Sequence, residues 1–419
     1  SGFVFGYYDS DRVFRSVGST GESAVTVVAD TSVAVGDSTF GAYHVQLSTA
    51  YASFDAAQAA ADDRGGYPVF YNGTYYVRVG SYTTMDAASN SAATAYGSVV
   101  SGGARSVLVV KSGTDQILFG FDCGSTYSLS LAPQSGSGAA VTQVAECKDR
   151  SGTRSCTYYG DFQFTRHSTQ DPQKLTLVNF VGLEPYVKGV TPYEMSSGWP
   201  LEALKAQAVC ARTYVASHMN GSPAYGFDVT GTTTSQVYYG TLDASANSDR
   251  AVDETAGKFV RYEGKLCETF YFAADGGATE DSENVWVTAV PYLRGVVDPY
   301  EKDIDFYCKS WSTPISRAAV GDVSITYTPI GNAMTVTVGD KTYSKDGVRT
   351  FLTRVCGLRY NSRHFTVKFD ADADAYSVAG GGSGHNCGMS QWGAKAMAEV
   401  HGKTYEEIIS FYYTGAYVA

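Results

Sequence analysis

An internal repeat in the first third of the chain is the feature that most restricts its fold. Residues 43–71 and 76–110 each contain an alternating strand, an Ala-rich helix that begins beside an Asp, and a closing strand, at 67–71 or 106–110. The copies are joined by Asn72-Gly73, a dipeptide that favours a tight hairpin turn. This βαβ-βαβ order predicts a ferredoxin-like domain with an antiparallel sheet, one face of which is free to bind a ligand.

The second copy also carries a short motif. Its first strand reads VRVGSY at 77–82 and is followed by an Ala-rich helix. Together with the repeat, this motif resembles a SPOR domain, a small module that binds peptidoglycan. The resemblance implies that exposed rings such as Tyr76 and Tyr82 stack on sugars, and the alternative is a ferredoxin-like spacer without a ligand.

The composition points to a protein that works outside the cytoplasm. Only 17% of the 419 residues are charged and 32 are tyrosines, so the surface is expected to be polar but largely uncharged. The net charge of −11 argues against a nucleic-acid partner, which requires a basic surface. No apolar run approaches the roughly 18 residues that span a bilayer. Because the chain starts at Ser1 without Met, we expect an extracytoplasmic location, in the cell wall or anchored to the membrane only through an N-terminal signal or anchor outside this sequence.

Eight cysteines are scattered along the chain without a Cys-x-x-Cys pair, so a metal knuckle is a weak interpretation. Cys147 and Cys156 are close enough in sequence to close a short loop by a disulfide. The alternative is that most cysteines are small buried hydrophobic residues.

Changes in sequence character divide the chain into four segments. We predict an N-terminal β segment at 1–40, the SPOR-like domain at 41–112, a β-rich connecting region at 113–170, and a larger domain at 171–419 in which helix signals are denser. The corresponding fold class is α+β. The last helix is expected to begin at Thr404, because a Glu three positions later completes a capping box.

A helix expected to begin at Pro200 is the most informative element of the larger domain. Apolar residues recur along it at three- and four-residue spacing and form one stripe: Leu201, Leu204, Ala208, Ala211 and Val215. Lys205 and Arg212 are seven positions apart and lie along one edge of that stripe. Two cations so aligned can clamp an anion or hydroxyl groups, and the alternative is a pair of surface cations with apolar stems.

Glu194 lies just before this helix, in a segment expected to be a loop. Its neighbours in sequence include Tyr193, Met195 and Trp199. Apolar and aromatic neighbours desolvate a carboxyl group and raise its pKa, which a general acid at neutral pH requires. The alternative is an ordinary solvated carboxylate.

Five blocks of sequence occur in an order that resembles the SpoIID/LytB family. They are GVTPYEM with WPLEALKAQAVCARTY at 189–214, SQVYYG at 235–240, the FAADGG segment with its following VW at 272–286, PYLRGV at 291–296, and GHNCGMSQWGA at 384–394. The resemblance covers about 175–419. Thr191 and Cys210 depart from the family pattern.

The resemblance implies a peptidoglycan lytic transglycosylase with Glu194 as its catalytic acid. In such enzymes one carboxyl protonates the leaving oxygen of the bond between N-acetylmuramic acid and N-acetylglucosamine. It then takes the proton of the muramic 6-hydroxyl, which attacks the anomeric carbon and gives a 1,6-anhydro end. An internal nucleophile removes the need for a second carboxylate. The implied partners are glycan strands, preferably stripped of stem peptides, in cell-wall remodelling such as engulfment during sporulation.

The remaining site residues follow from the same blocks. Lys205 and Arg212 are expected to hold polar groups of the substrate or the Glu194 segment. The groove is expected to be lined by Gln236, His385, Ser390 and Gln391, with a purely structural hydrogen bonder as the alternative for His385. A Ser/His hydrolase is disfavoured, because no Gly-x-Ser-x-Gly elbow surrounds Ser390.

No metal and no other cofactor is expected for this chain. Several relatives carry Cys-Asp-Ser-Thr-His-Cys and bind zinc at the positions of residues 230–235, where this chain reads TGTTTS. Two other functions stay open. One is a non-catalytic, LytB-like glycan binder that enhances a cell-wall N-acetylmuramoyl-L-alanine amidase; the other is a structural or adhesion protein that acts through its SPOR-like module.

Overall fold

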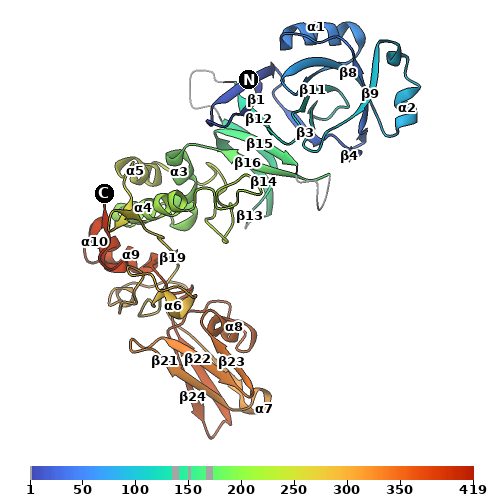
Figure 1. The fold of residues 1–419 in the computed structure, drawn as a ribbon. Helices are drawn as coiled ribbons and strands as arrows, with labels where there is room; N and C mark the ends of the chain where they lie inside the picture. Colours follow the sequence, from blue (N-terminus) through green and yellow to red (C-terminus); the bar gives the residue numbers. More distant parts are fainter. Residues whose placement is uncertain (1, 135–140, 150–151, 167–172) are drawn as a thin grey trace. The chain divides into compact units, whose positions relative to one another are not determined.

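The computed structural model describes residues 2–134, 141–149, 152–166 and 173–419. The chain is a mixed α/β protein with several sheets (Figure 1). It divides into two compact units, the first formed by Ser1–Gly182 with Asn220–Asp228 and the second by Leu183–Met219 with Val229–Ala419. None of the helices in the described part is long and apolar enough to cross a bilayer.

The first unit is built on a seven-stranded sheet of order β3-β10-β11-β7-β8-β6-β9. In that order the strands are Val25–Ala29, Val107–Lys111, Ile117–Asp122, Tyr67–Tyr71, Thr74–Tyr82, Tyr43–Leu47 and Gly97–Ser101. Helix α1 (Phe54–Arg64) connects β6 to β7, and α2 (Met85–Ser89) lies between β8 and β9. Both helices begin at a side-chain cap, Ser53 or Thr84, which explains why the predicted helix starts are correct.

One strand of the predicted repeat lies elsewhere in this sheet. Residues 106–110 overlap β10, which pairs with β3 and β11, whereas β9 closes the second copy beside β6. Strand β10 is buried and takes an interior place, while the half-exposed β9 forms an edge. The sheet is not wholly antiparallel either, because β11 pairs in parallel with β7. The βαβ-βαβ segment is therefore part of a larger sheet, and its identification as a SPOR domain stays a prediction.

A five-stranded sheet completes the core of the first unit. Its order is β16-β15-β12-β1-β2, with strands Leu175–Phe180, Asp161–Arg166, Leu129–Pro133, Phe3–Tyr8 and Phe14–Thr20. Phe5 of β1 stacks on Phe119 of β11 with ring centroids 4.8 Å apart, so the two sheets share one apolar core. Two hairpins flank them, β4–β5 (Val33–Val35, Ser38–Phe40) and β13–β14 (Val141–Asp149, Gly152–Tyr159).

The cysteines are explained in part. Cys123, Cys210, Cys267, Cys308, Cys356 and Cys387 are buried thiols, as the alternative interpretation expected. Burial raises their pKa, for example to about 12 for Cys210. The side chain of Cys147 lies outside the described residues, so its pairing with Cys156 stays a prediction.

Arg78 of the VRVGSY motif has a structural role. Its side chain is 1% exposed and lies 3.4 Å from Asp30 and 3.3 Å from Asp122. His44 adds a third polar contact to this buried group, 2.7 Å from Asp30. Tyr76 and Tyr82 are half-buried. The motif therefore contributes its arginine to the interior of the unit.

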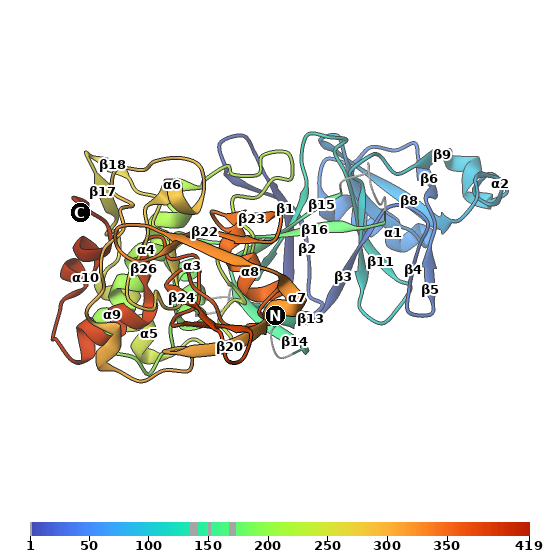
Figure 2. The ribbon, with the colours of Figure 1, turned by 90° about the horizontal axis from the view of Figure 1, so that it is seen from below.

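The second unit is organised around a buried helix, α4 (Leu201–Ser217). It is surrounded by α3 (Leu183–Glu194), α5 (Ala246–Glu254), α9 (Gln391–Glu399) and α10 (Tyr405–Tyr412), as Figures 1 and 2 both show. The predicted single stripe is too narrow, because almost every residue from Ala203 to Val215 is buried. Helix α10 begins at Thr404 with the predicted capping box to Glu407.

Residues 311–380 form a β-rich part of the second unit that the sequence analysis did not separate. One sheet has the order β20-β25-β24 (Trp311–Ser316, Ala375–Gly380, Phe365–Asp370), and the other the order β21-β22-β23 (Val323–Tyr327, Ala333–Val338, Lys341–Ser344). Together with α8 (Gly347–Arg354) and the short α7 (Arg317–Val320) they enclose a separate apolar core that includes Val336, Phe351 and Val378.

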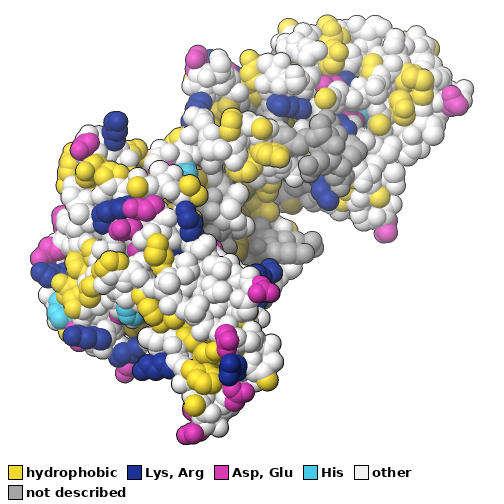
Figure 3. Space-filling model, turned by 60° about the horizontal axis from the view of Figure 1, so that its bottom comes forward, with side chains coloured by type: hydrophobic (Ala, Val, Ile, Leu, Met, Phe, Trp, Pro, Cys, Tyr) yellow, Lys and Arg dark blue, Asp and Glu magenta, His cyan; other side chains and the backbone are white. Residues whose placement is uncertain are grey.

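Short strands pair the segment at 260–272 with the last part of the chain. β17 (Val260–Tyr262) pairs with β18 (Lys265–Leu266) and with β27 (Tyr417–Val418) near the end of the chain. β19 (Tyr271–Phe272) pairs in parallel with β26 (Met389–Ser390) directly before α9. On the face in Figure 3, cationic and anionic side chains are interspersed among a larger uncharged area.

Candidate active site

Glu194 is the last residue of helix α3, not part of a loop. Pro192 lies inside the helix, which ends directly after Glu194, and the glutamate side chain is half-buried. Its Oε1 accepts a hydrogen bond of 3.0 Å from the backbone N–H of Val237. Its Oε2 accepts one of 3.4 Å from the side-chain amide of Gln391. The carboxyl group is thus held by two segments that are distant in sequence.

Gln391 is placed by the start of α9. The strand pair β19–β26 ends at Ser390, and the hydroxyl of Ser390 caps the helix by accepting a hydrogen bond of 3.1 Å from Gly393 N. The amide of Gln391 also contacts Gln207 Oε1 at 3.3 Å. Gln207, buried on α4, lies inside the first family-like block, at 189–214, but the sequence alone did not single it out.

Gln236 is a buried hydrogen-bonding centre beside this contact. Its Oε1 accepts from the hydroxyl of Tyr186 at 3.0 Å, and its Nε2 donates to Ala211 O at 3.2 Å and to the hydroxyl of Tyr271 at 3.0 Å. It precedes Val237 and so fixes the backbone N–H that reaches Glu194. Burial raises the pKa of Tyr186 and Tyr271, and the nearby charge of Glu194 raises both further.

Lys205 and Arg212 each pair with carboxylates other than Glu194. Lys205 forms ion pairs with Glu202 at 2.8 Å and Glu254 at 2.7 Å. Arg212 is fully buried, and its guanidinium contacts both carboxylate oxygens of Glu184, at 2.9 and 2.6 Å. Since Glu184 lies in the first turn of α3, Arg212 fastens the helix that ends at Glu194. Direct substrate binding by either cation stays a prediction.

His385 and Ser390 are both engaged within the protein. The Nδ1 of His385 accepts from Cys387 N at 3.2 Å, which makes Nε2 the protonated nitrogen that donates to Tyr271 O at 3.2 Å. Burial lowers the pKa of His385 to about 4, so the ring is neutral near pH 7. The hydroxyl of Ser390 donates to Glu301, away from Glu194. These contacts support the structural alternative for His385.

Comparison with known proteins identifies relatives of this chain. A family model described as SpoIID, stage II sporulation protein, matches residues 171–262. Stage II sporulation protein D of Bacillus subtilis is 32% identical over 269 residues, which cover 58% of this chain and 76% of that protein. The chain belongs to the SpoIID family. An uncharacterized protein of Brachyspira hyodysenteriae is 37% identical over 286 residues, covering 65% of this chain and 75% of that protein.

A further relative differs in size. The amidase enhancer of Bacillus subtilis is 32% identical over 288 residues, which cover 55% of this SpoIID-family chain but 39% of the enhancer. The shared part is thus well under half of that protein.

A group of aromatic rings adjoins Gln391, the residue that contacts Glu194, in this SpoIID-family member. Trp392, which follows Gln391, packs against Trp199 with centroids 4.6 Å apart and is stacked on Phe306 at 4.9 Å. Lys395 Nζ lies 5.0 Å from the centre of the Trp392 ring. The sequence analysis named Trp199, but it missed Trp392 and Phe306. Half-buried rings of this kind offer apolar faces on which sugar rings can stack.

Residues 230–235 form a hydroxyl-lined turn. Thr230 N donates to Ser235 Oγ at 3.2 Å, and Ser235 N donates to Thr232 O at 3.0 Å. Thr and Ser hydroxyls are poor zinc ligands, since zinc is bound by Cys, His and carboxylates. Elsewhere among the described residues, a carboxylate group of Asp275, Asp298 and Glu301 has the side chains for a metal site.

Proposed function

We propose that this SpoIID-family protein is a lytic transglycosylase that cleaves the bond between N-acetylmuramic acid and N-acetylglucosamine in peptidoglycan strands. The observation that carries the proposal is the fixed carboxyl of Glu194, which accepts hydrogen bonds from Val237 N–H and from Gln391. Trp392, the residue after Gln391, packs against Trp199. Acid–base catalysis needs such a group in one defined orientation.

The placement of Glu194 also suits a group that must carry a proton. It lies at the C-terminal end of α3, where the helix dipole is negative and disfavours a neighbouring anion. Glu194 would protonate the leaving oxygen and then accept the proton of the muramic 6-hydroxyl as this hydroxyl attacks the anomeric carbon. The bond between that oxygen and the anomeric carbon replaces the glycosidic bond, so no water is consumed.

The test is digestion of peptide-free glycan strands by the native protein. The expected product ends in 1,6-anhydro-N-acetylmuramic acid, which mass spectrometry distinguishes from a hydrolysed end by the mass of one water. Reducing ends without the anhydro bond would contradict the transglycosylase mechanism.

A second candidate is favoured by the amidase-enhancer relative. In that case the protein binds glycan strands and stimulates a separate cell-wall amidase without cutting a glycosidic bond. The two functions are separated by one experiment in which glycan ends and amidase products are measured with and without the protein.

The N-terminal unit is proposed to hold the strand that the second unit cuts. Removing only residues 1–112 would disrupt both sheets of the first unit. Strand β11 would lose its neighbour β10, and β12 would lose its neighbour β1. A fragment of residues 183–419 is the better probe, since it leaves the second unit nearly complete. We expect it to cleave soluble strands but to bind insoluble peptidoglycan more weakly than the full chain.

The contact between Gln391 and Glu194 gives a pH-dependent prediction. Gln391→Glu places a like charge beside Glu194 and so favours its protonated form. Activity that needs this proton is lost as pH rises, so the alkaline limb of the pH–rate profile should move to higher pH. Val400→Glu adds the same charge at an exposed position just after the end of α9 and should leave the limb in place. An unshifted limb in Gln391→Glu would exclude Glu194 as the titrating acid.

A further inference from the structure

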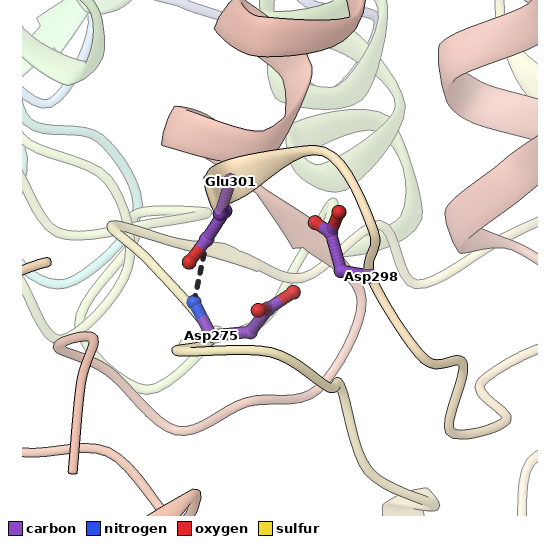
Figure 4. A group of neighbouring side chains, drawn as sticks. All are labelled: Asp275, Asp298 and Glu301. Carbon is purple, nitrogen blue, oxygen red and sulfur yellow. Dashed lines mark hydrogen bonds between the residues drawn. The ribbon is translucent and has the colours of Figure 1, made fainter. Parts of the chain in front are cut away.

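Three acidic side chains lie close together inside the second unit, next to Ser390 at the start of α9. Asp275 lies after β19, Asp298 follows the PYLRGV segment, and Glu301 begins a short 3-10 helix, Glu301–Asp303. They are 0%, 6% and 4% exposed, and one carboxylate oxygen from each lies within 4.8 Å of the others. Figure 4 shows that Asp298 and Glu301 lie on one loop segment and Asp275 on a second one.

Backbone N–H and hydroxyl groups hold these carboxylates in place. Glu301 accepts hydrogen bonds from Asp275 N at 2.8 Å, from Gly276 N at 2.9 Å and from Ser390. Asp298 accepts from Tyr300 N at 2.7 Å and from the Tyr412 hydroxyl at 2.6 Å. The arrangement is thus built from neutral donors on four segments.

One oxygen of this group has no such donor. Asp275 Oδ1 accepts from Gly277 N at 2.7 Å, but Oδ2 is buried and has no N–H or hydroxyl donor among the described residues. It can hydrogen-bond to Asp298 only when one of the two carboxyls carries a proton. The Asp275 carboxyl faces that of Asp298. A buried, unpartnered carboxylate oxygen directed at other carboxylates is costly unless a cation or a proton lies between them.

The three carboxylates repel one another when they are all charged. Burial raises the pKa of Asp275, and the charges of Glu301 and Asp298 raise it further. Burial also raises the pKa of Glu301 to about 6, in spite of its hydrogen bond from Ser390. A bound cation would remove the repulsion between all three groups at once.

We propose that Asp275, Asp298 and Glu301 bind a hard divalent cation, Ca²⁺ or Mg²⁺. Both ions prefer oxygen ligands, and carboxylates are their usual protein ligands. Two ligands on opposite sides of one Ca²⁺ are about 4.6–5.2 Å apart, so a maximum separation of 4.8 Å lets one ion reach all three residues. The hydroxyl oxygens of Ser390 and Tyr412 adjoin the same carboxylates as further ligands.

The ion would stabilise the start of α9. Ser390 binds Glu301 and caps this helix, and Gln391 follows it. Gly393 lies against the other side of the group, where an added Cβ would be 2.4 Å from Asp298 Oδ2 and 1.9 Å from the Tyr412 hydroxyl. A bound cation would thus link the Asp275 loop and the Asp298–Glu301 loop to the turn at Ser390. This turn places Gln391 next to Glu194, and the ion itself would not contact Glu194.

The test measures metal binding by the full chain without any glycan, so its result does not depend on the proposed enzymatic function. Protein freed of metal with a chelator is titrated with CaCl₂ and with MgCl₂ by calorimetry, and thermal unfolding is followed over the same concentrations. We expect one ion per chain and a transition temperature that rises with the concentration of the preferred metal. Asp275→Asn should weaken binding at least about tenfold.

Asp305→Asn is the matched control, because it removes one exposed carboxylate a few residues after Glu301. It should bind metal as the native chain does. Should Asp275→Asn fail to fold, Glu301→Gln and the native protein provide the same comparison. No binding of either ion at millimolar concentration, or equal binding by Asp275→Asn and the native chain, would overturn the proposal. So would an Asp275→Asn variant that is more stable than the native chain in the presence of either metal.

Discussion

Replacing Glu194 with Gln is expected to reduce glycan cleavage at least about a hundredfold, because positioned acid–base groups contribute that much or more. Glutamine has nearly the same shape, and its carbonyl oxygen can still accept the hydrogen bond from Val237 N–H. It cannot give a proton to the leaving oxygen or take one from the 6-hydroxyl. The rate is measured from the anhydro ends released from peptide-free strands.

Glu268→Gln is the matched control for this variant, since Glu268 is an exposed glutamate of the same unit. It should retain the native rate, and both variants should still bind glycan strands. Full product from Glu194→Gln would exclude Glu194 as the acid. Equal stimulation of an amidase by the native chain and Glu194→Gln, with no anhydro ends from either, would favour the enhancer function.

Replacing Arg212 with Met is expected to cost roughly 3 kcal/mol of unfolding free energy in the second unit, because it removes a buried guanidinium from the half-buried carboxylate of Glu184. The guanidinium contacts Glu184 and also donates to Val252 O at 3.2 Å and Lys258 O at 3.3 Å. Methionine fills much of the volume but supplies none of these hydrogen bonds. The change is measured by denaturant unfolding, and activity should fall as well, because α3 carries Glu194.

Lys205→Met tests whether the effect is specific to Arg212. It lies seven positions earlier on α4, and its partners Glu202 and Glu254 are partly exposed. Loss of such pairs costs about 0–1 kcal/mol. If the two substitutions lowered the free energy of unfolding equally, Arg212 would contribute no more to stability than Lys205, contrary to this prediction.

Local signals explain which elements could be predicted. Pro200 precedes α4, Ser53 and Thr84 cap α1 and α2, and Thr404 with Glu407 starts α10. Each signal acts over three or four residues, so the sequence alone is enough to recognise it. The family of the C-terminal part was likewise recognisable from its ordered blocks, and the comparisons confirm it.

Contacts between distant residues explain what could not be predicted. Gln391 and Glu194 are 197 positions apart, and no local pattern says that they meet. Lys205 and Arg212 look equivalent on a helical wheel, but α5 and the first turn of α3 bury only the second. The place of β10 within its sheet, and the strands at 311–380, also depend on tertiary pairing.

The wide separation of the segments around Glu194 has a consequence for biosynthesis. A ribosome releases Glu194, Gln207 and Val237 long before it reaches Gln391, at about 5–20 residues per second. Until α9 and α10 emerge, the buried faces of α4 lack two of their neighbours. The nascent chain therefore passes through a stage in which its central helix is exposed, and Glu194 gains its second hydrogen-bond donor only when the last segments have been translated.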